Sequence, residues 1–374
     1  GAARMKIITG HVLDVLPTLP EKAVQCVVTS PPYWGLRKYA GEQEVVWGGK
    51  EGCDHEWGPE LPDPHKTGLS IGGNSEKIGG YLKETREGKT AGSFCSLCGA
   101  WRGAFGLEPS PALYIEHSMA ILDALWRVLR DDGVLWWTLG DSYSSSDKSG
   151  STPGGSPKHV NGALTTEPRP NRKKLIGLKP KDLCLIPFRF ALAAQERGWW
   201  VRSDIIWHKP NPMPESVRDR PTRSHEYIFM LTKAARYYYD AEAVREPIKM
   251  SNVGECSLVE REGGTKFDEN KKPVGAIRHY DVIKGANCRS VWTFATQPYP
   301  EAHFATFPPE LPRRCILAST RPGDVVLDPF SGSGTTVQVA EELGREGWGI
   351  DISQEYRALQ ETRLAPLQGQ TRIG

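Results

Sequence analysis

The feature that most constrains this chain is a glycine-rich segment directly behind a short apolar run near its C-terminus. The apolar residues 325–327 precede Asp328, and apolar side chains recur at helical spacing after residue 336. This pattern predicts a strand, a tight loop and a helix. Gly332 and Gly334 let the backbone approach a ligand because neither has a Cβ atom, and the helix start offers free N–H groups to a polar ligand. Plain strand–turn–helix packing is the alternative interpretation.

The next predicted strand, residues 347–350, ends at Asp351, where a Rossmann-like sheet usually holds a ribose diol. Further apolar runs predict strands at 5–10, 24–29, 134–141, 199–207 and 228–231. Helical spacing predicts helices at 113–129, 182–197 and 312–319. The first is expected to bury Tyr114, His117, Ile121, Leu122, Leu125 and Val128, and the second Leu185, Phe188, Phe190, Leu192 and Ala193. The fold class is therefore α/β, with helices on both faces of a central sheet.

A second polar segment follows the buried strand 24–29. It consists of Ser30, Pro31, Pro32 and Tyr33. Two consecutive prolines cannot continue a strand ladder, so the chain leaves the sheet at its carboxyl edge, where open α/β sheets bind their ligands. A proline-terminated strand with a core tyrosine is the alternative.

These two segments together resemble a known family. Residues 30–33 resemble the (Asp/Asn/Ser)-Pro-Pro-(Tyr/Phe) motif of enzymes that methylate an exocyclic base nitrogen, and residues 328–336 resemble their Asp-Pro-Phe-x-Gly-x-Gly-Thr-Thr cofactor loop. The order, with the catalytic motif first, is that of β-class DNA amino-methyltransferases. Residues 204–240 resemble that class's Trp-x-Lys-Pro-Asn-Pro-Met-Pro and Arg-x-x-x-x-His-Glu block. The resemblance implies a Rossmann-like, circularly permuted methyltransferase fold with a mixed central sheet.

The resemblance also implies roles for individual residues. Ser30 and the Pro31 carbonyl would accept hydrogen bonds from the amino group of an extruded base, Pro32 would fix the strand exit, and Tyr33 would stack on the base. Residues 140–143 would flank that base. The implied S-adenosylmethionine-binding residues are Asp14, Thr29, His303, Thr306, Phe307, Asp328, Pro329, Phe330, Gly332, Gly334, Thr335 and Asp351. For Asp14, helix capping is the alternative.

The segment 47–105 has little apolar periodicity and does not fit the sheet. It contains a Cys-x-His pair, Cys53 and His55, and a Cys-x-x-Cys-Gly knuckle, Cys95 and Cys98. This set has the ligand types of a structural zinc site, in which the metal would replace the hydrophobic core that the insertion lacks. A redox pair or free thiols in a loop are the alternatives.

The chain therefore divides into five predicted regions. They are a catalytic half at 5–46, a zinc-binding insertion at 47–105, a core at 106–245 with a basic loop at 144–181, a target-recognition region at 246–297 and a cofactor-binding half at 298–368. The last part of this loop, residues 169–181, carries six cations without an acid among them, and it would either contact DNA phosphates or remain solvated.

Composition narrows the functional class. Forty-seven basic and 45 acidic residues leave a net charge of +2, which excludes a histone-like polycation. Eight cysteines without an apolar leader favour a reducing cytoplasm, and no run approaches the roughly 20 apolar residues that span a bilayer. We expect a cytoplasmic, nucleoid-associated enzyme whose partner is double-stranded DNA. Cytosine N4 and adenine N6 both stay open, with Ser30 favouring cytosine.

Four further questions stay open from the sequence alone. RNA or protein glutamine could be the substrate instead of DNA, and a catalytically dead, zinc-stabilised DNA-binding protein is a rival from another class. Neither a homodimer nor a companion restriction endonuclease is decided by the sequence.

Overall fold

The structure is a computed structural model that describes residues 5–35, 43–61, 92–144, 178–179, 181–247, 285–296 and 307–368. Two predicted cofactor residues, His303 and Thr306, lie outside these ranges. Most of the basic loop 144–181 and of the predicted target-recognition region 246–297 also lies outside them.

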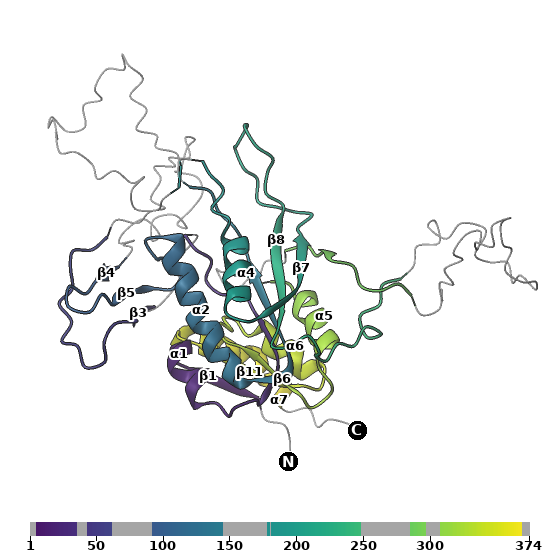
Figure 1. Cartoon of the computed structure of the whole chain (residues 1–374). Coiled ribbons are helices and arrows are strands. Elements are labelled where there is room, and N and C mark those ends of the chain that lie inside the picture. The colour runs from purple at the N-terminus through teal and green to yellow at the C-terminus, as the bar shows by residue number, and fades with distance from the viewer. Residues whose placement is uncertain are drawn as a thin grey trace, which may run out of the picture.

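A mixed eight-stranded sheet forms the centre of the protein (Figure 1). Its strands are β1 (Lys6–Thr9), β2 (Val24–Thr29), β6 (Leu129–Leu139), β7 (Trp200–His208), β8 (His225–Thr232), β9 (Val291–Thr293), β10 (Val325–Asp328) and β11 (Glu346–Asp351). Their spatial order is β1-β11-β10-β2-β6-β8-β7-β9. Strand β8 runs antiparallel to both neighbours, and the other described pairs are parallel. The predicted mixed sheet is confirmed.

The two ends of the chain meet in the middle of this sheet. Strand β10 lies between β11 and β2, with Val326 opposite Cys26 and Leu327 opposite Val27. Because β2 and β10 are parallel, their carboxyl ends lie at the same sheet edge. The loops that follow them therefore leave the sheet side by side, although they are some three hundred residues apart in the sequence.

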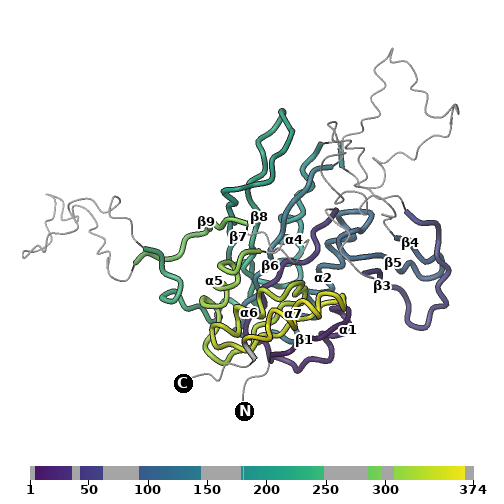
Figure 2. The backbone as a smooth tube through the Cα atoms, turned by 180° about the vertical axis from the view of Figure 1, so that it is seen from behind, coloured from purple at the N-terminus to yellow at the C-terminus, as the bar shows by residue number. Residues whose placement is uncertain are grey.

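Helices cover both sheet faces, as predicted. One face carries α1 (Val12–Val15), the 3-10 turn η1 (Leu16–Thr18), α2 (Pro111–Val128) and α4 (Ile186–Glu196), and the other carries α5 (Glu310–Ser319) and α6 (Thr335–Glu342). Figure 2 shows α5 and α6 from behind, with α7 (Gln354–Gln368), which packs on α6, β1 and β11. Two hydrophobic cores result, one on each face: Val27 belongs to the first and Val28 to the second, because successive strand residues point to opposite faces.

The helix α2 matches its prediction closely. Ser110 caps it, because its Oγ accepts a hydrogen bond from the Leu113 N–H at 3.2 Å, and Pro111 occupies the first turn. All six predicted core residues of this helix are buried. Its apolar stripe was therefore readable from spacing alone.

The predicted core of α4 is wrong in part. Leu185, Phe188 and Leu192 are 42%, 40% and 61% exposed, whereas Phe190 is fully buried against Trp137. The helix begins only at Ile186, because Leu185 adopts the left-handed backbone conformation. From this start, Ile186, Phe190 and Ala194 face the core at intervals of four residues.

A separate three-stranded sheet stands beside α2 (Figure 1). Its strands, in spatial order, are β3 (Glu44–Trp47), β5 (Trp101–Ala104) and β4 (Ser93–Phe94). We expected this insertion to lack a hydrophobic core. This expectation is wrong for the part of the small sheet that packs against the main core. Trp47 and Trp101 are only 3% and 1% exposed and pack into the main core.

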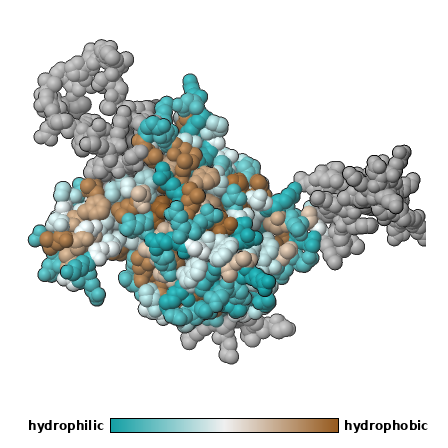
Figure 3. Space-filling view, in the orientation of Figure 1, coloured by the Kyte–Doolittle hydropathy of each residue, from teal (hydrophilic) through white to brown (hydrophobic). Residues whose placement is uncertain are grey.

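The surface shown in Figure 3 is largely hydrophilic over its lower part, and apolar residues gather higher up, where α4 lies. Among the helices within the described ranges, none combines the length and the apolar character needed to cross a membrane.

Candidate active site

The loops that follow β2 and β10 line one cleft. Its empty volume, including the open mouth, is about 1040 Å³, which accommodates a ligand of nucleoside size. Nine predicted site residues line it: Ser30, Pro32, Phe307, Asp328, Pro329, Phe330, Gly332, Thr335 and Asp351. The other lining residues are Gly10, His11, Val12, Gln43, Trp47, Phe105, Ser331, Ser333, Ile352 and Tyr356. The catalytic and cofactor segments predicted from the sequence therefore share one crevice.

Asp328 joins the two strands beneath the cleft. Its Oδ1 accepts hydrogen bonds from the Thr29 hydroxyl at 2.7 Å and the Phe330 N–H at 3.1 Å, and its Oδ2 accepts one from the Thr336 hydroxyl at 2.7 Å. Burial raises the pKa of Asp328 to about 6, and the two hydroxyl hydrogen bonds oppose this shift. Thr29 does not line the cleft itself, but its hydroxyl group holds the carboxyl group of Asp328, which does.

The glycine loop is closed by Asp351 from β11. The Gly332 N–H donates to Asp351 Oδ2 at 2.8 Å, and the Ser353 N–H donates to Oδ1 at 2.9 Å. Gly332 has a φ of +48°, and a Cβ atom added there would meet no atom within 4 Å, so its open side faces free space. Burial raises the pKa of Asp351. Backbone N–H groups of Gly332, Ile352 and Ser353 oppose this shift, and three donors leave at least one lone pair of the carboxylate for a ligand hydroxyl.

Two α7 residues, which sequence reasoning missed, hold this loop from behind. The Gln360 side-chain amide donates to Ser331 Oγ at 3.0 Å and to the Gly332 carbonyl at 2.7 Å, and Gln360 is fully buried. Arg363 donates to Ser333 Oγ at 3.0 Å and Thr335 Oγ1 at 3.1 Å. No motif marks these residues, because they lie about 30 positions beyond the loop.

A hydrogen-bond chain fixes the side chain of Tyr33. The Ser30 hydroxyl donates to Tyr33 Oη at 3.1 Å, and the Tyr33 hydroxyl donates to Glu226 Oε2 at 2.7 Å. The other oxygen of Glu226 pairs with the Lys209 ammonium group. Gly140 makes room for the Tyr33 ring, since a Cβ atom there would lie 2.8 Å from it. Lys209 and Glu226 stand in the block whose resemblance was noted, but the sequence assigned them no role.

The backbone of residues 32–35 is braced as well. Tyr114 donates its hydroxyl to the Pro32 carbonyl at 3.0 Å, and the Gly35 N–H donates to the Gly106 carbonyl at 2.7 Å. Glu108 accepts from the Gly106 N–H at 2.9 Å and pairs with His117. Burial raises the pKa of Glu108, and the hydrogen bond to His117 opposes the shift.

The segment after β6 lies next to this loop. Asp141 Oδ1 accepts from the N–H groups of Ser142 at 2.9 Å and Ile186 at 3.1 Å, which fixes the start of α4. Asp141 Oδ2 and the Ser142 hydroxyl oxygen are buried, and neither has a hydrogen-bond partner among the described residues. Burial raises the pKa of Asp141.

Asp14 lies apart from the cleft. It is exposed on α1 and is not a lining residue, and the N-cap position of α1 belongs to His11. His11, which the sequence did not single out, lines the cleft and meets Trp47 edge-on with 4.9 Å between ring centroids. Burial lowers the pKa of His11, so its neutral form is favoured.

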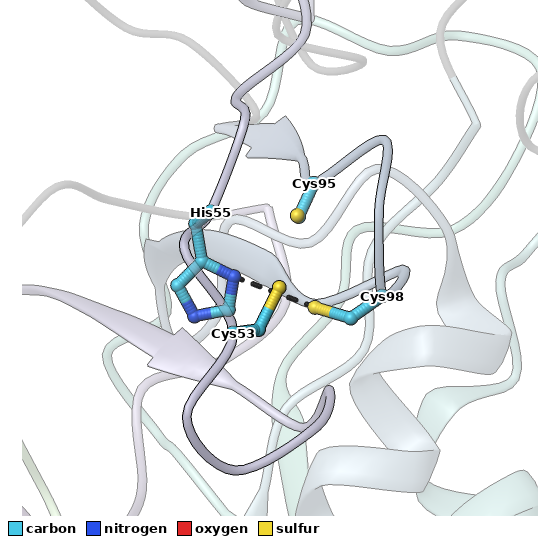
Figure 4. A group of neighbouring side chains, drawn as sticks. All are labelled: Cys53, His55, Cys95 and Cys98. Carbon is cyan, nitrogen blue, oxygen red and sulfur yellow. Dashed lines mark hydrogen bonds between the residues drawn. The ribbon is translucent and has the colours of Figure 1, made fainter.

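The four predicted metal ligands come together. Figure 4 shows Cys53 and His55 on one segment and Cys95 and Cys98 on a turn opposite, with their side chains converging. All four ligand atoms lie within 4.8 Å of one another. The cluster lies in the insertion and supplies no lining residue to the cleft.

Comparisons with known proteins agree with this geometry. The family model for N6/N4 DNA methylases matches residues 24–361. The Type II methyltransferase M.Cfr9I of Citrobacter freundii is 38% identical over 358 residues, which cover 96% of this chain and 87% of that protein. The Type II methyltransferase M.SmaI of Serratia marcescens is 36% identical over 96% of this chain and 90% of that protein.

Solved structures share the fold. The PvuII DNA methyltransferase, described as cytosine-N4-specific, superposes with a TM-score of 0.52 at 15% identity, over 100% of this chain and 90% of that one. A protein of Thermus thermophilus, solved in complex with S-adenosyl-L-methionine, gives a TM-score of 0.50 at 18% identity, over 98% of this chain and 96% of that one.

Proposed function

The chain belongs to the N6/N4 DNA methylase family, and from this membership we propose how its cleft carries out the reaction. It is a site-specific DNA methyltransferase that transfers a methyl group from S-adenosylmethionine to an exocyclic amino group of a base. The observation that carries the assignment of roles is the shared cleft, which Ser30 and Pro32 line together with the glycine loop around Gly332. Because the relatives are Type II methyltransferases, we infer a restriction–modification setting.

The cleft fits S-adenosylmethionine, which supplies an electrophilic methyl group on its sulfonium. Asp351 lines the cleft, and its carboxylate would accept the ribose hydroxyls. Gly332 leaves open space where a side chain would otherwise reach the ligand. Phe330 and Phe105 stack with 5.7 Å between centroids and give a flat, apolar wall for the adenine or the methionine chain.

The catalytic segment aligns and activates the base. An exocyclic amino group attacks poorly while its lone pair is delocalised into the ring, and the base must first leave the duplex stack. Ser30 Oγ and the Pro31 carbonyl would accept hydrogen bonds from the amino group and favour a tetrahedral nitrogen. The new N–C bond forms as the S–C bond breaks, and the nitrogen then releases one proton. Tyr33 would stack on the extruded ring.

Glu226 and Lys209 serve this step as positioning residues. The Glu226 carboxylate accepts a hydrogen bond from the Tyr33 hydroxyl, and the Lys209 ammonium group holds that carboxylate in place. Asp141 Oδ2 is a buried acceptor with a free lone pair in the segment next to Tyr33, and we assign it to the polar edge of the extruded base.

We propose cytosine N4 as the target atom. Support comes from the serine at the first position of the catalytic motif, Ser30. The decisive experiment incubates the purified protein with S-adenosylmethionine and unmethylated genomic DNA and separates the resulting nucleosides by mass spectrometry. We expect N4-methylcytosine. N6-methyladenine would refute the base assignment, and methylation of neither base would refute the function.

The assigned roles are tested by substitution. Ser30→Ala and Tyr33→Ala should abolish methyl transfer while S-adenosylmethionine binding, measured by calorimetry, is retained. Tyr239→Ala is the matched control because Tyr239 is 40% exposed and does not line the cleft. Loss of transfer and binding together in the Ser30 and Tyr33 variants would contradict the division of roles.

A further inference from the structure

The cysteine–histidine cluster has the dimensions of a tetrahedral zinc site. With Zn–S bonds of about 2.3 Å and Zn–N bonds of about 2.0 Å, neighbouring ligand atoms lie about 3.5–3.8 Å apart. His55 Nδ1 and Cys98 Sγ are 3.4 Å apart, and no pair in the cluster exceeds 4.8 Å. Shifts of about 1 Å or less would therefore bring all four atoms into ligand positions.

The backbone around the cluster is already shaped for this purpose. The Cys95 carbonyl accepts from the Gly99 N–H at 3.0 Å, and Gly99 has a φ of +74°, which closes the Cys-x-x-Cys turn. Cys95 Sγ accepts from the Leu97 N–H at 3.4 Å, a contact that stabilises a thiolate ligand. The Ser96 N–H donates to the Glu56 carbonyl at 2.9 Å and ties this turn to the segment that carries Cys53 and His55.

Three thiolates and one imidazole complete a zinc coordination sphere. Four protein ligands leave no open position, so the ion would be structural rather than catalytic. The two ligand pairs come from segments about 40 residues apart in the sequence: Cys53 and His55 follow β3, and Cys95 and Cys98 lie between β4 and β5. A metal ion here would link the two halves of the insertion.

The same small sheet builds one wall of the cofactor cleft. Trp47, at the end of β3, and Phe105, directly after β5, both line the cleft, with 5.4 Å between their ring centroids. Trp47 also stacks on His117 at 4.3 Å. Phe105 stacks on Phe330 of the glycine loop. The wall therefore depends on the position of β3 relative to β5.

The insertion reaches the catalytic segment too. Gly106 follows Phe105, and its carbonyl accepts the Gly35 N–H. A Cβ atom on Gly106 would lie 3.1 Å from Pro32 Cβ and 3.1 Å from the Tyr33 carbonyl oxygen, so the two backbones are in close contact. Displacement of β5 would consequently move groups on both sides of the cleft.

We propose that Cys53, His55, Cys95 and Cys98 bind one structural Zn²⁺ ion, and that this ion positions Trp47 and Phe105 as the aromatic wall of the S-adenosylmethionine cleft. The second part rests on the proposed function, because it takes the ligand of the cleft to be the methyl donor. The first part does not.

Metal content tests the first part. The full-length protein, purified without chelator, is analysed by plasma mass spectrometry, and we expect one zinc ion per chain. The double substitution Cys95→Ser/Cys98→Ser should remove it. Cys288→Ser is the matched control, since Cys288 is a half-buried thiol outside the cluster, and it should keep the zinc. Wild-type protein that neither contains nor takes up zinc, or that has a Cys95–Cys98 disulfide by mass mapping, would overturn the site.

Cofactor affinity tests the second part. Wild-type protein is stripped of metal by chelation, dialysed, and titrated with S-adenosylmethionine by calorimetry before and after one equivalent of Zn²⁺ is restored. We expect affinity to fall about tenfold or more without the metal, because the aromatic wall loosens, and to recover with it. Far-ultraviolet circular dichroism of the stripped protein should keep the signal of the main sheet, which has its own core.

The outcomes separate the two proposals. Equal affinity with and without zinc would overturn the coupling between the ion and the cleft. Zinc-loaded wild-type protein that binds no S-adenosylmethionine would instead refute the proposed function and leave the metal site standing. If the double cysteine variant does not fold, the chelation series on wild-type protein still decides both parts.

Discussion

The contact between Tyr33 and Glu226 gives the sharpest test of the catalytic geometry. The 2.7 Å distance between Tyr33 Oη and Glu226 Oε2 is typical of a charge-assisted hydrogen bond. The Glu226 and Lys209 side chains are only 17% and 20% exposed, so water screens the interaction little. Glu226→Gln keeps the shape of the side chain and removes its charge. The amide has only one oxygen, so it can accept a hydrogen bond from the tyrosine hydroxyl on one side or from the lysine ammonium group on the other, but not on both sides.

The expected loss of methylation rate in Glu226→Gln follows from the type of hydrogen bond that is removed. A hydrogen bond to an ionised partner contributes about 1.5–3 kcal/mol. If this energy fixes Tyr33 and Ser30 in the reactive geometry, its loss lowers the single-turnover methylation rate by about tenfold to a hundredfold. Binding of S-adenosylmethionine should not change, because Glu226 does not line the cleft.

A double-mutant cycle distinguishes positioning from a general loss of structure. Glu226→Gln, Tyr33→Phe and the double variant are compared in single-turnover methylation, with cofactor affinity measured by calorimetry. Glu342→Gln is the control, since the Glu342 carboxylate on α6 forms an ion pair with Arg313 of α5, away from the tyrosine. We expect the double variant to be no slower than the slower single variant, because both remove the same bond.

Two results would refute this reasoning. Rate losses of the two single variants that simply add in the double variant would mean that Glu226 and Tyr33 act independently. A parallel fall in cofactor affinity would place the effect of Glu226 in the folding of the cleft rather than in the positioning of the tyrosine.

Three further predictions concern the cofactor side. The pKa of Asp328 is about 6 in the folded chain against an ordinary value of 3.8, so the stability it contributes is present below about pH 4 and lost as pH rises through about 6. Asp328→Asn should therefore reduce the pH dependence of the unfolding free energy between about pH 4 and 7 by up to about 3 kcal/mol in urea titrations; an unchanged pH profile would contradict this. Gln360→Met removes two hydrogen bonds to the glycine loop and should weaken S-adenosylmethionine binding by about tenfold in calorimetry, whereas unchanged affinity would show that the loop needs no support from α7. Gly334→Ala forces a side chain into a backbone with φ of +82° and should cost about 1–2 kcal/mol in denaturant unfolding; a neutral result would show that the loop adapts.

Local chemistry was readable from the sequence wherever it depends on neighbouring residues. Proline after β2 must leave the sheet, so the exit at Ser30 could be placed without a structure. Gly332 and Gly334 predicted a backbone that approaches a ligand without a Cβ atom; Gly332 lines the cleft, and the structure adds that both residues have positive φ. The spacing of Cys95 and Cys98 indicated a metal-type knuckle for the same reason, because a two-residue gap fixes the geometry of the turn.

The predicted core of α4 was wrong in part because the start of this helix is set by a distant residue. Asp141, 45 positions earlier, accepts the Ile186 N–H, and Leu185 is left in a left-handed conformation outside the helix. Successive helix residues are rotated by about 100° around the helix axis. The stripe that contains Phe188 and Leu192 therefore lies on a different face from the stripe that contains Ile186, Phe190 and Ala194. Spacing within the segment could not reveal this contact.

The sequence by itself determined the type of fold, through strand and helix patterns along the chain, and the two loops of the cleft, because each loop is encoded in a few consecutive side chains. Only the tertiary structure decided which groups support them. Glu226 reaches Tyr33 across 193 positions, Gln360 holds Gly332 from a later helix, and Phe105 comes from the insertion to line the cleft. Such partners depend on the order in which strands pack, and strand order is fixed by the burial of the whole sheet rather than by any local run of residues.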